Sequence, residues 1–103
     1  MEQTLQAYID KLLESEEYLE YALQRDRVKE QPELKAQIDA FRIRNYEMQT
    51  SKDMVFEKIE AFEREYEDFT EIPLVADFLA AELAFCRMMQ RHNGRIMEAI
   101  DFE

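Results

Sequence analysis

The chain has 103 residues, a formal charge of −11 at pH 7 and an apolar content of 47%. This apolar content argues against intrinsic disorder. The excess of carboxylates argues against direct binding of nucleic acid or of an anionic membrane, because both need clustered Lys and Arg. One glycine and two prolines leave little for hairpin turns, and the abundant Glu, Leu, Ala, Gln, Lys, Arg and Met favour helices. We therefore expect one all-α domain over residues 1–103.

The sequence carries no signal for a membrane-bound or secreted protein. No apolar run approaches the ~20 residues of a membrane-spanning helix. The N-terminal residues 1–4 lack the basic start and apolar centre of a signal peptide, and the single cysteine cannot form an internal disulfide. We expect a cytoplasmic protein.

The first helical segment is predicted over residues 2–30. Its apolar face is formed by Leu5, Tyr8, Ile9, Leu12, Leu19 and Leu23. Ser15, Glu16 and Glu17 interrupt this pattern. Two helices joined by a bend are therefore an alternative, with Ser15 as the N-cap of the second.

The second helix is predicted from Pro32, because proline fits the first helical position and pushes the preceding residue out of the helical region. Its apolar stripe is formed by Leu34, Ile38, Phe41 and Met48. Asn45 lies inside that stripe. Residues 50–53 offer several capping side chains and mark the end of the helix.

The third helix is predicted over residues 54–69, and this part of the chain is strongly acidic. Its carboxylates are Glu57, Glu60, Glu63, Glu65, Glu67, Asp68 and Glu71, opposed only by Lys58 and Arg64. One interpretation is a solvated surface that aids solubility. The other is a docking surface that steers a basic partner electrostatically. On the second interpretation, Glu60, Glu63 and Glu67 are candidate interaction residues.

The fourth helix is predicted over residues 73–102. Its apolar stripe is formed by Val75, Phe78, Leu79, Phe85, Cys86, Met89, Ile96, Met97 and Ile100. Glu82 and Asn93 lie near the middle of this stripe, where an unpaired buried carboxylate would be costly. Glu82 therefore either reaches water through a gap or joins a polar network, with Asn45, Arg42 or Arg44 as partners. Such a network would fix helix register or dimer pairing.

Four other residues of this helix lead to separate expectations. Cys86 is expected to be buried as a small apolar side chain, and His92 is expected at the surface or at the boundary of the core. Leu83 and Met88 fall off the stripe. Leftover apolar residues of this kind suggest a second contact surface and hence self-association.

The sequence predicts no catalytic, metal-binding or cofactor-binding residues. His92 is the only histidine, so the Glu-x-x-His pairs of di-iron bundles are absent. Cys86 and His92 alone cannot supply the ligands of a zinc site. We therefore expect a bundle of four or five amphipathic helices, at least two of them long, that is not an enzyme.

Several motifs occur in an order that resembles a known family. They are Ser15-Glu16-Glu17-Tyr18, Pro32-Glu33-Leu34 with Ile38 and Phe41, and Ile72-Pro73-Leu74-Val75-Ala76-Asp77-Phe78 leading to Ala81-Glu82, with Ile96 and Ile100. This arrangement, over nearly the whole chain, resembles the YlbF/YmcA/YheA family of short helical bacterial proteins. The resemblance implies an all-helical fold, self-association and no enzymatic activity. It also implies a cytoplasmic complex among paralogues that influences messenger RNA processing, competence, biofilm formation and sporulation.

The resemblance also bears on cofactors and partners. Some family members hold iron–sulfur clusters through cysteines, but Cys86 is alone here and such clusters need several thiolates. We therefore expect no cofactor. The leading hypothesis is a regulatory adaptor that binds itself, paralogous helical proteins or an RNA-processing nuclease. The alternatives are a small-ligand or metal sensor using Glu82, Asn93 and His92, and an enzyme of unfamiliar type.

Overall fold

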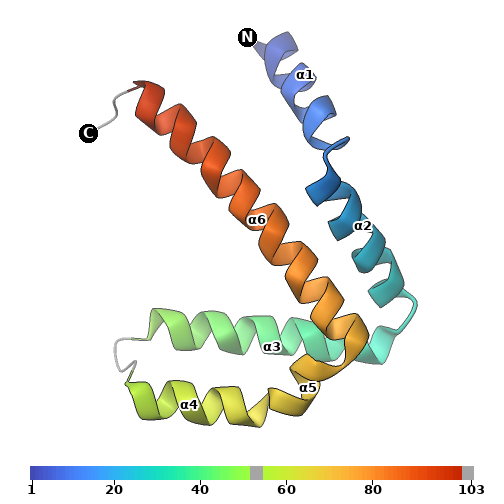
Figure 1. The fold of residues 1–103 in the computed structure, drawn as a ribbon, viewed down its shortest axis with the longest axis vertical. Coiled ribbons are helices and arrows are strands. Elements are labelled where there is room, and N and C mark those ends of the chain that lie inside the picture. Colours follow the sequence, from blue (N-terminus) through green and yellow to red (C-terminus); the bar gives the residue numbers. More distant parts are fainter. Residues whose placement is uncertain (52–54, 101–103) are drawn as a thin grey trace. The chain divides into compact units, whose positions relative to one another are not determined.

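The computed structural model describes residues 1–51 and 55–100. These residues form α1 (Glu2–Leu12), α2 (Glu16–Lys29), α3 (Pro32–Thr50), α4 (Phe56–Glu65), α5 (Glu67–Glu71) and α6 (Pro73–Ile100), as Figure 1 shows. Neither described range contains a strand, so the all-α prediction is confirmed. With 19 residues in α3 and 28 in α6, the prediction of at least two long helices is also confirmed.

The chain divides into two compact units, which are described separately below. Unit 1 comprises Met1–Arg25 and Phe78–Glu103, and unit 2 comprises Asp26–Asp77. Helices α2 and α6 each contribute residues to both units. The expectation of a single domain stays a prediction.

In unit 1, the break between α1 and α2 follows from one side chain. The Oγ of Ser15 accepts a hydrogen bond from the backbone N–H of Tyr18 at 3.1 Å and donates one to the carbonyl of Leu12 at 2.7 Å. The first bond satisfies an N–H that has no partner within the helix, which is how an N-cap stabilises a helix start. Of the two arrangements considered for residues 2–30, two helices joined by a bend with Ser15 as the cap is therefore the one confirmed.

The core of unit 1 lies where α6 approaches α2 (Figure 1). Phe78, Ala81 and Met88 are buried on α6. Tyr21 of α2 stacks on Phe85 with ring centroids 5.5 Å apart and approaches Phe78 at 6.0 Å. Such pairs contribute about 0.5–1.5 kcal/mol beyond the apolar area that they bury, so they hold α2 against one face of α6.

The buried face of α6 differs from the predicted stripe. Met88 was expected off the stripe but is only 4% exposed. Cys86 was expected to be buried but is exposed. These expectations are wrong for the single chain because α6 has two apolar faces. Helical periodicity identifies both faces, but only the packing of α1 and α2 decides which one is covered.

In unit 2, α3 and α4 run antiparallel, side by side (Figure 1). Pro32 occupies the start of α3 as predicted. Ile72 has the extended ψ of 124° expected before Pro73, which opens α6. Ile38 and Val75 are the largest fully buried side chains among the described residues, and both belong to this unit.

The predicted third helix is divided into α4 and α5 at Tyr66. Its φ of −104° and ψ of 7° leave the helical region. Thr70 Oγ1 donates a hydrogen bond to the Tyr66 carbonyl at 3.0 Å. No glycine or proline marks this break. The break at Tyr66 and the separation of α1 from α2 together explain why the described residues form six helices instead of the predicted four or five.

Candidate functional site

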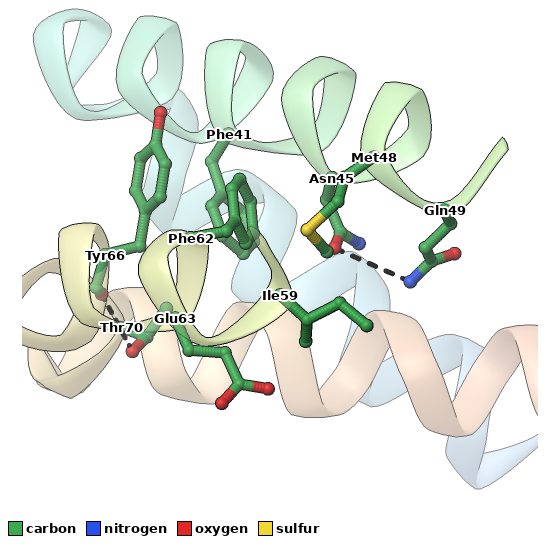
Figure 2. Close-up of a pocket in the computed structure, with 9 residues that line it drawn as sticks. All are labelled: Phe41, Asn45, Met48, Gln49, Ile59, Phe62, Glu63, Tyr66 and Thr70. Carbon is green, nitrogen blue, oxygen red and sulfur yellow. Dashed lines mark hydrogen bonds between the residues drawn. The ribbon is translucent and has the colours of Figure 1, made fainter. Parts of the chain in front are cut away.

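In unit 2, an open pocket of about 410 Å³ lies between α3 and the α4–α5 segment. Figure 2 shows its lining, which consists of Phe41, Asn45, Met48, Gln49, Ile59, Phe62, Glu63, Tyr66 and Thr70. The spacing of three and four residues along both helices places these side chains on facing stripes. We call this feature the α3–α4 pocket.

Aromatic rings form one wall of the α3–α4 pocket. The ring of Phe41 stacks on that of Phe62 with centroids 5.7 Å apart. Tyr66 approaches each of these two rings at 4.9 Å. These three rings, from α3, α4 and the break between α4 and α5, pack against one another and form one apolar surface that can receive an apolar side chain.

Polar groups lie around this aromatic wall. Asn45 Oδ1 accepts a hydrogen bond from Gln49 Nε2 at 3.5 Å, and Thr70 bonds to the backbone of Tyr66 (Figure 2). Glu63 is exposed and points away from α3 (Figure 2). The structure thus brings two predicted residues, Asn45 and Glu63, into one pocket.

An arginine clamp joins α3 to α4 beside this pocket. The Arg44 guanidinium donates to both carboxylate oxygens of Glu65, at 2.5 and 3.0 Å, and to the hydroxyl of Tyr66 at 2.9 Å. It also lies over the Tyr66 ring at 5.2 Å. The hydrogen bond from Arg44 lowers the pKa of Glu65 below its ordinary value, and the bond to Glu65 raises the pKa of Arg44. This pairing was missed because it joins positions 21 residues apart in the sequence.

The three acidic candidates on α4 and α5 differ in their pairing. Glu60 is half-buried and pairs with Arg64 one turn further along. Glu63 and Glu67 are exposed, and neither side-chain carboxylate has a hydrogen bond or ion pair within the described residues. Five exposed carboxylates of this segment have no side-chain hydrogen bond or ion pair within the described residues, and we call them the acidic rim. They are Glu57, Glu63, Glu67, Asp68 and Glu71. Of the acidic rim, Glu63 also lines the α3–α4 pocket.

Glu82 and Asn93 belong to unit 1, where Glu82 is half-buried and Asn93 is exposed. Asn45 bonds to Gln49, and Arg44, one of the partners suggested for Glu82, bonds to Glu65. The network around Glu82 stays a prediction, and so does an interaction role for Asn93.

His92 occupies the boundary position predicted for it. Its Nδ1 lies 2.7 Å from the Tyr8 hydroxyl, which joins α6 to α1. The imidazole is half-buried. A shallow surface depression of about 380 Å³ lies beside this contact, lined by Met1, Thr4, Leu5, Tyr8, His92, Arg95 and Ile96. The contact thus links α1 to α6 within unit 1.

The described residues offer neither a metal-binding group nor a membrane-spanning helix. Within residues 1–51 and 55–100, no group of three or more His, Cys, Asp and Glu side chains is placed to hold a metal ion. None of the helices described in Figure 1 is both long and apolar enough to cross a membrane.

Comparison with known proteins gives one clear relationship. The family model described as "Control of competence regulator ComK, YlbF/YmcA" matches residues 2–101. The match covers nearly the whole chain of 103 residues. No curated protein and no solved structure matches the chain significantly.

Proposed function

The chain belongs to the YlbF/YmcA family, whose description is "Control of competence regulator ComK". From this premise we propose that it is a non-catalytic regulator that acts by binding other proteins. Its proposed partners are further copies of itself, paralogous helical proteins or an RNA-processing nuclease. The observation that carries the proposal is the α3–α4 pocket with its acidic rim.

The shape and polarity of the α3–α4 pocket favour a protein partner. Protein interfaces are anchored by a few apolar side chains that enter such pockets, with polar groups around them. The wall formed by Phe41, Phe62 and Tyr66 offers the apolar part. Glu63 and Glu67 offer charges that no group within the described residues neutralises. The complementary surface is an apolar anchor flanked by Lys or Arg.

The polar groups of the pocket support binding rather than catalysis. Among the described residues that line it, Glu63 is the single carboxylate, and there is no His, Cys or Lys. General acid–base catalysis and nucleophilic catalysis both depend on two or more positioned groups of this kind. The Arg44–Glu65 pair lies nearby, but each group satisfies the other.

The test is affinity purification of the tagged chain from its native host, with quantitative mass spectrometry of the bound proteins. The double variant Glu63→Lys, Glu67→Lys reverses two exposed charges without removing a side-chain hydrogen bond or ion pair between described residues. The control Glu98→Lys makes the same kind of change at an exposed position of unit 1. We expect a specific partner to be recovered with the wild type and the control but depleted with the double variant.

The size of this effect follows from ordinary surface electrostatics. An exposed ion pair contributes about 0.2–1 kcal/mol, and reversal replaces attraction by repulsion at two positions. The dissociation constant of the purified partner should therefore rise on the order of tenfold, and less at high salt. Equal recovery with all three proteins would reject this surface as the binding site.

A further inference from the structure

The apolar side chains of the α3–α4 pocket are only partly covered. Within α3 and α4, which the structure describes in full, Ile38 alone is buried, and it does not line the pocket. The apolar side chains that the two helices contribute to the pocket are half-buried, and they are Phe41, Met48, Ile59 and Phe62. The apolar side of a helix becomes fully buried only when another element packs on it. The pocket is therefore a place where a further element can pack.

The surroundings of the pocket determine which kind of element fits. Its walls are helices, whose interior N–H and C=O groups are bonded within each helix, so no strand edge is available. Asn45 and Gln49 bond to each other, and the hydroxyl of Thr70 donates to the carbonyl of Tyr66 (Figure 2). An extended segment in the pocket would lose water from backbone groups without gaining enough partners. A helix satisfies its own backbone groups and avoids this cost.

The length of the pocket corresponds to about two helical turns. On the α3 side, Gln49 follows Phe41 by eight residues, which is about 12 Å at 1.5 Å per residue. On the α4 side, Tyr66 follows Ile59 by seven residues, which is about 10 Å. Apolar side chains at positions i, i+4 and i+7 of a third helix cover the same distance and lie on one face. Three apolar anchors from such a helix therefore match the pocket.

The two sides of the pocket differ in charge. On the α4–α5 side, Glu63 is exposed and has no side-chain hydrogen bond or ion pair within the described residues. Glu67 has the same properties and directly follows Tyr66, which also lines the pocket. The α3 side offers the uncharged amides of Asn45 and Gln49. The complementary helix carries Lys or Arg along the edge beside α4. Because copies of a chain with charge −11 repel one another, another protein is the better source of this helix.

We propose that the α3–α4 pocket binds a basic amphipathic helix of another protein, two turns of which insert three apolar side chains between α3 and α4. This inference rests on the proposed function and deepens it, because it names the kind of segment that the partner presents. The three helices then form one packed unit in which the apolar side chains of the pocket are covered.

Two labelled peptides of roughly 18 residues serve as probes, a length at which a helix is no longer strongly disfavoured. The helical peptide carries leucines at i, i+4 and i+7, lysines along one edge, and alanine and glutamine elsewhere. The reordered peptide has the same composition, but its leucines alternate at i, i+2 and i+4. General attraction of a cationic peptide to this acidic chain acts equally on both. A difference in affinity therefore reports the helical pattern.

Fluorescence anisotropy with the full chain measures both affinities. We expect saturable binding of the helical peptide and about tenfold weaker binding of the reordered peptide. Circular dichroism of the mixture should show more helix than the two components measured separately, and a proline in the middle of the helical peptide should abolish binding. Equal affinities, binding without a gain of helix, or no binding of the helical peptide would overturn the proposal.

A matched pair of substitutions in unit 2 tests where the helical peptide binds. Ile59 lines the pocket and is half-buried, whereas Ile43 of α3 is 60% exposed and does not line it. We expect Ile59→Ala to weaken binding about fivefold and Ile43→Ala to leave it unchanged, with circular dichroism confirming that both variants are helical. The double variant Glu63→Lys, Glu67→Lys, which changes only exposed positions, should weaken it about tenfold. Unchanged affinity in both Ile59→Ala and the double variant would overturn this location.

The helix and the proposed function fail in different ways. Recovery of a host partner that depends on Glu63 and Glu67, without binding of the helical peptide, would overturn the helix and leave protein binding at this surface standing. Binding of the helical peptide by a chain that recovers no partner from its host would contradict the proposed function alone.

Discussion

Met88 and Met89 are neighbours in the sequence, and exchanging each for alanine tests which face of α6 forms the core. The periodicity of the sequence places Met89 on the apolar stripe and Met88 off it. In the structure Met88 is buried and Met89 is half-buried. Both substitutions have nearly the same effect on intrinsic helix propensity. Any difference in the free energy of unfolding therefore reports the packing of the side chain.

The expected size of this difference follows from burial. Met88→Ala removes three non-hydrogen atoms from a site that is 4% exposed. At about 0.8 kcal/mol per buried methylene the lost transfer energy is roughly 2.4 kcal/mol. The cavity left behind raises the total to about 3 kcal/mol, within the 2–5 kcal/mol observed for such substitutions. For the half-buried Met89 we expect about 1 kcal/mol.

Urea unfolding followed by circular dichroism, at one fixed protein concentration, measures both losses of stability. A loss of about 3 kcal/mol is a large fraction of the stability of a domain of this size, so it is readily resolved. If Met89→Ala were the more destabilising substitution, the assignment of the inner face of α6 would be wrong.

Three further predictions concern local features. Ser15→Ala removes the cap on the backbone N–H of Tyr18, so unfolding measurements should show a loss of about 1 kcal/mol. Gly94→Ala should raise stability by about 0.5–1 kcal/mol in the same assay, because an added Cβ meets nothing within 4 Å and alanine is the better helix former; a loss would contradict this. The pKa of Glu65 is lower in the folded state than its ordinary value of 4.5, because Arg44 donates hydrogen bonds to it. Its contribution to stability is therefore complete above pH 4.5 and is lost as the pH falls through the lower folded value. Unfolding curves at several pH values should show less acid sensitivity for Glu65→Gln than for the wild type.

The helix starts could be predicted from the sequence because they depend on nearest neighbours. Ser15 caps α2 through a residue three positions away. Pro32 and Pro73 open α3 and α6 through the fixed geometry of the proline ring. The all-α class follows from composition for a similar reason, since helix propensities act one residue at a time.

Features that depend on packing between helices could not be predicted in the same way. The break at Tyr66 contains neither glycine nor proline. The Arg44–Glu65 clamp needs α3 and α4 to lie side by side. The choice between the two apolar faces of α6 is made by α1 and α2, so Cys86 and Met88 exchanged their expected environments.

The candidate site was predicted only in part. The acidic character of residues 54–69 identified Glu63 and Glu67, because a run of carboxylates is visible in any sequence. The aromatic wall beside them was not identified, because Phe41 lies on a different helix from Phe62 and Tyr66. The interaction role of the acidic residues remains a prediction.

The most direct test of protein binding as the function compares the proteins recovered from the native host with three baits. These baits are the wild-type chain, the double variant that carries both Glu63→Lys and Glu67→Lys, and the control variant Glu98→Lys. A binding regulator with its site at the α3–α4 pocket predicts a partner that is retained by the wild type and by Glu98→Lys, is depleted about tenfold with the double variant, and binds directly once purified. Recovery of no protein other than the chain itself, with all three baits folded, would contradict binding of a different protein as its function.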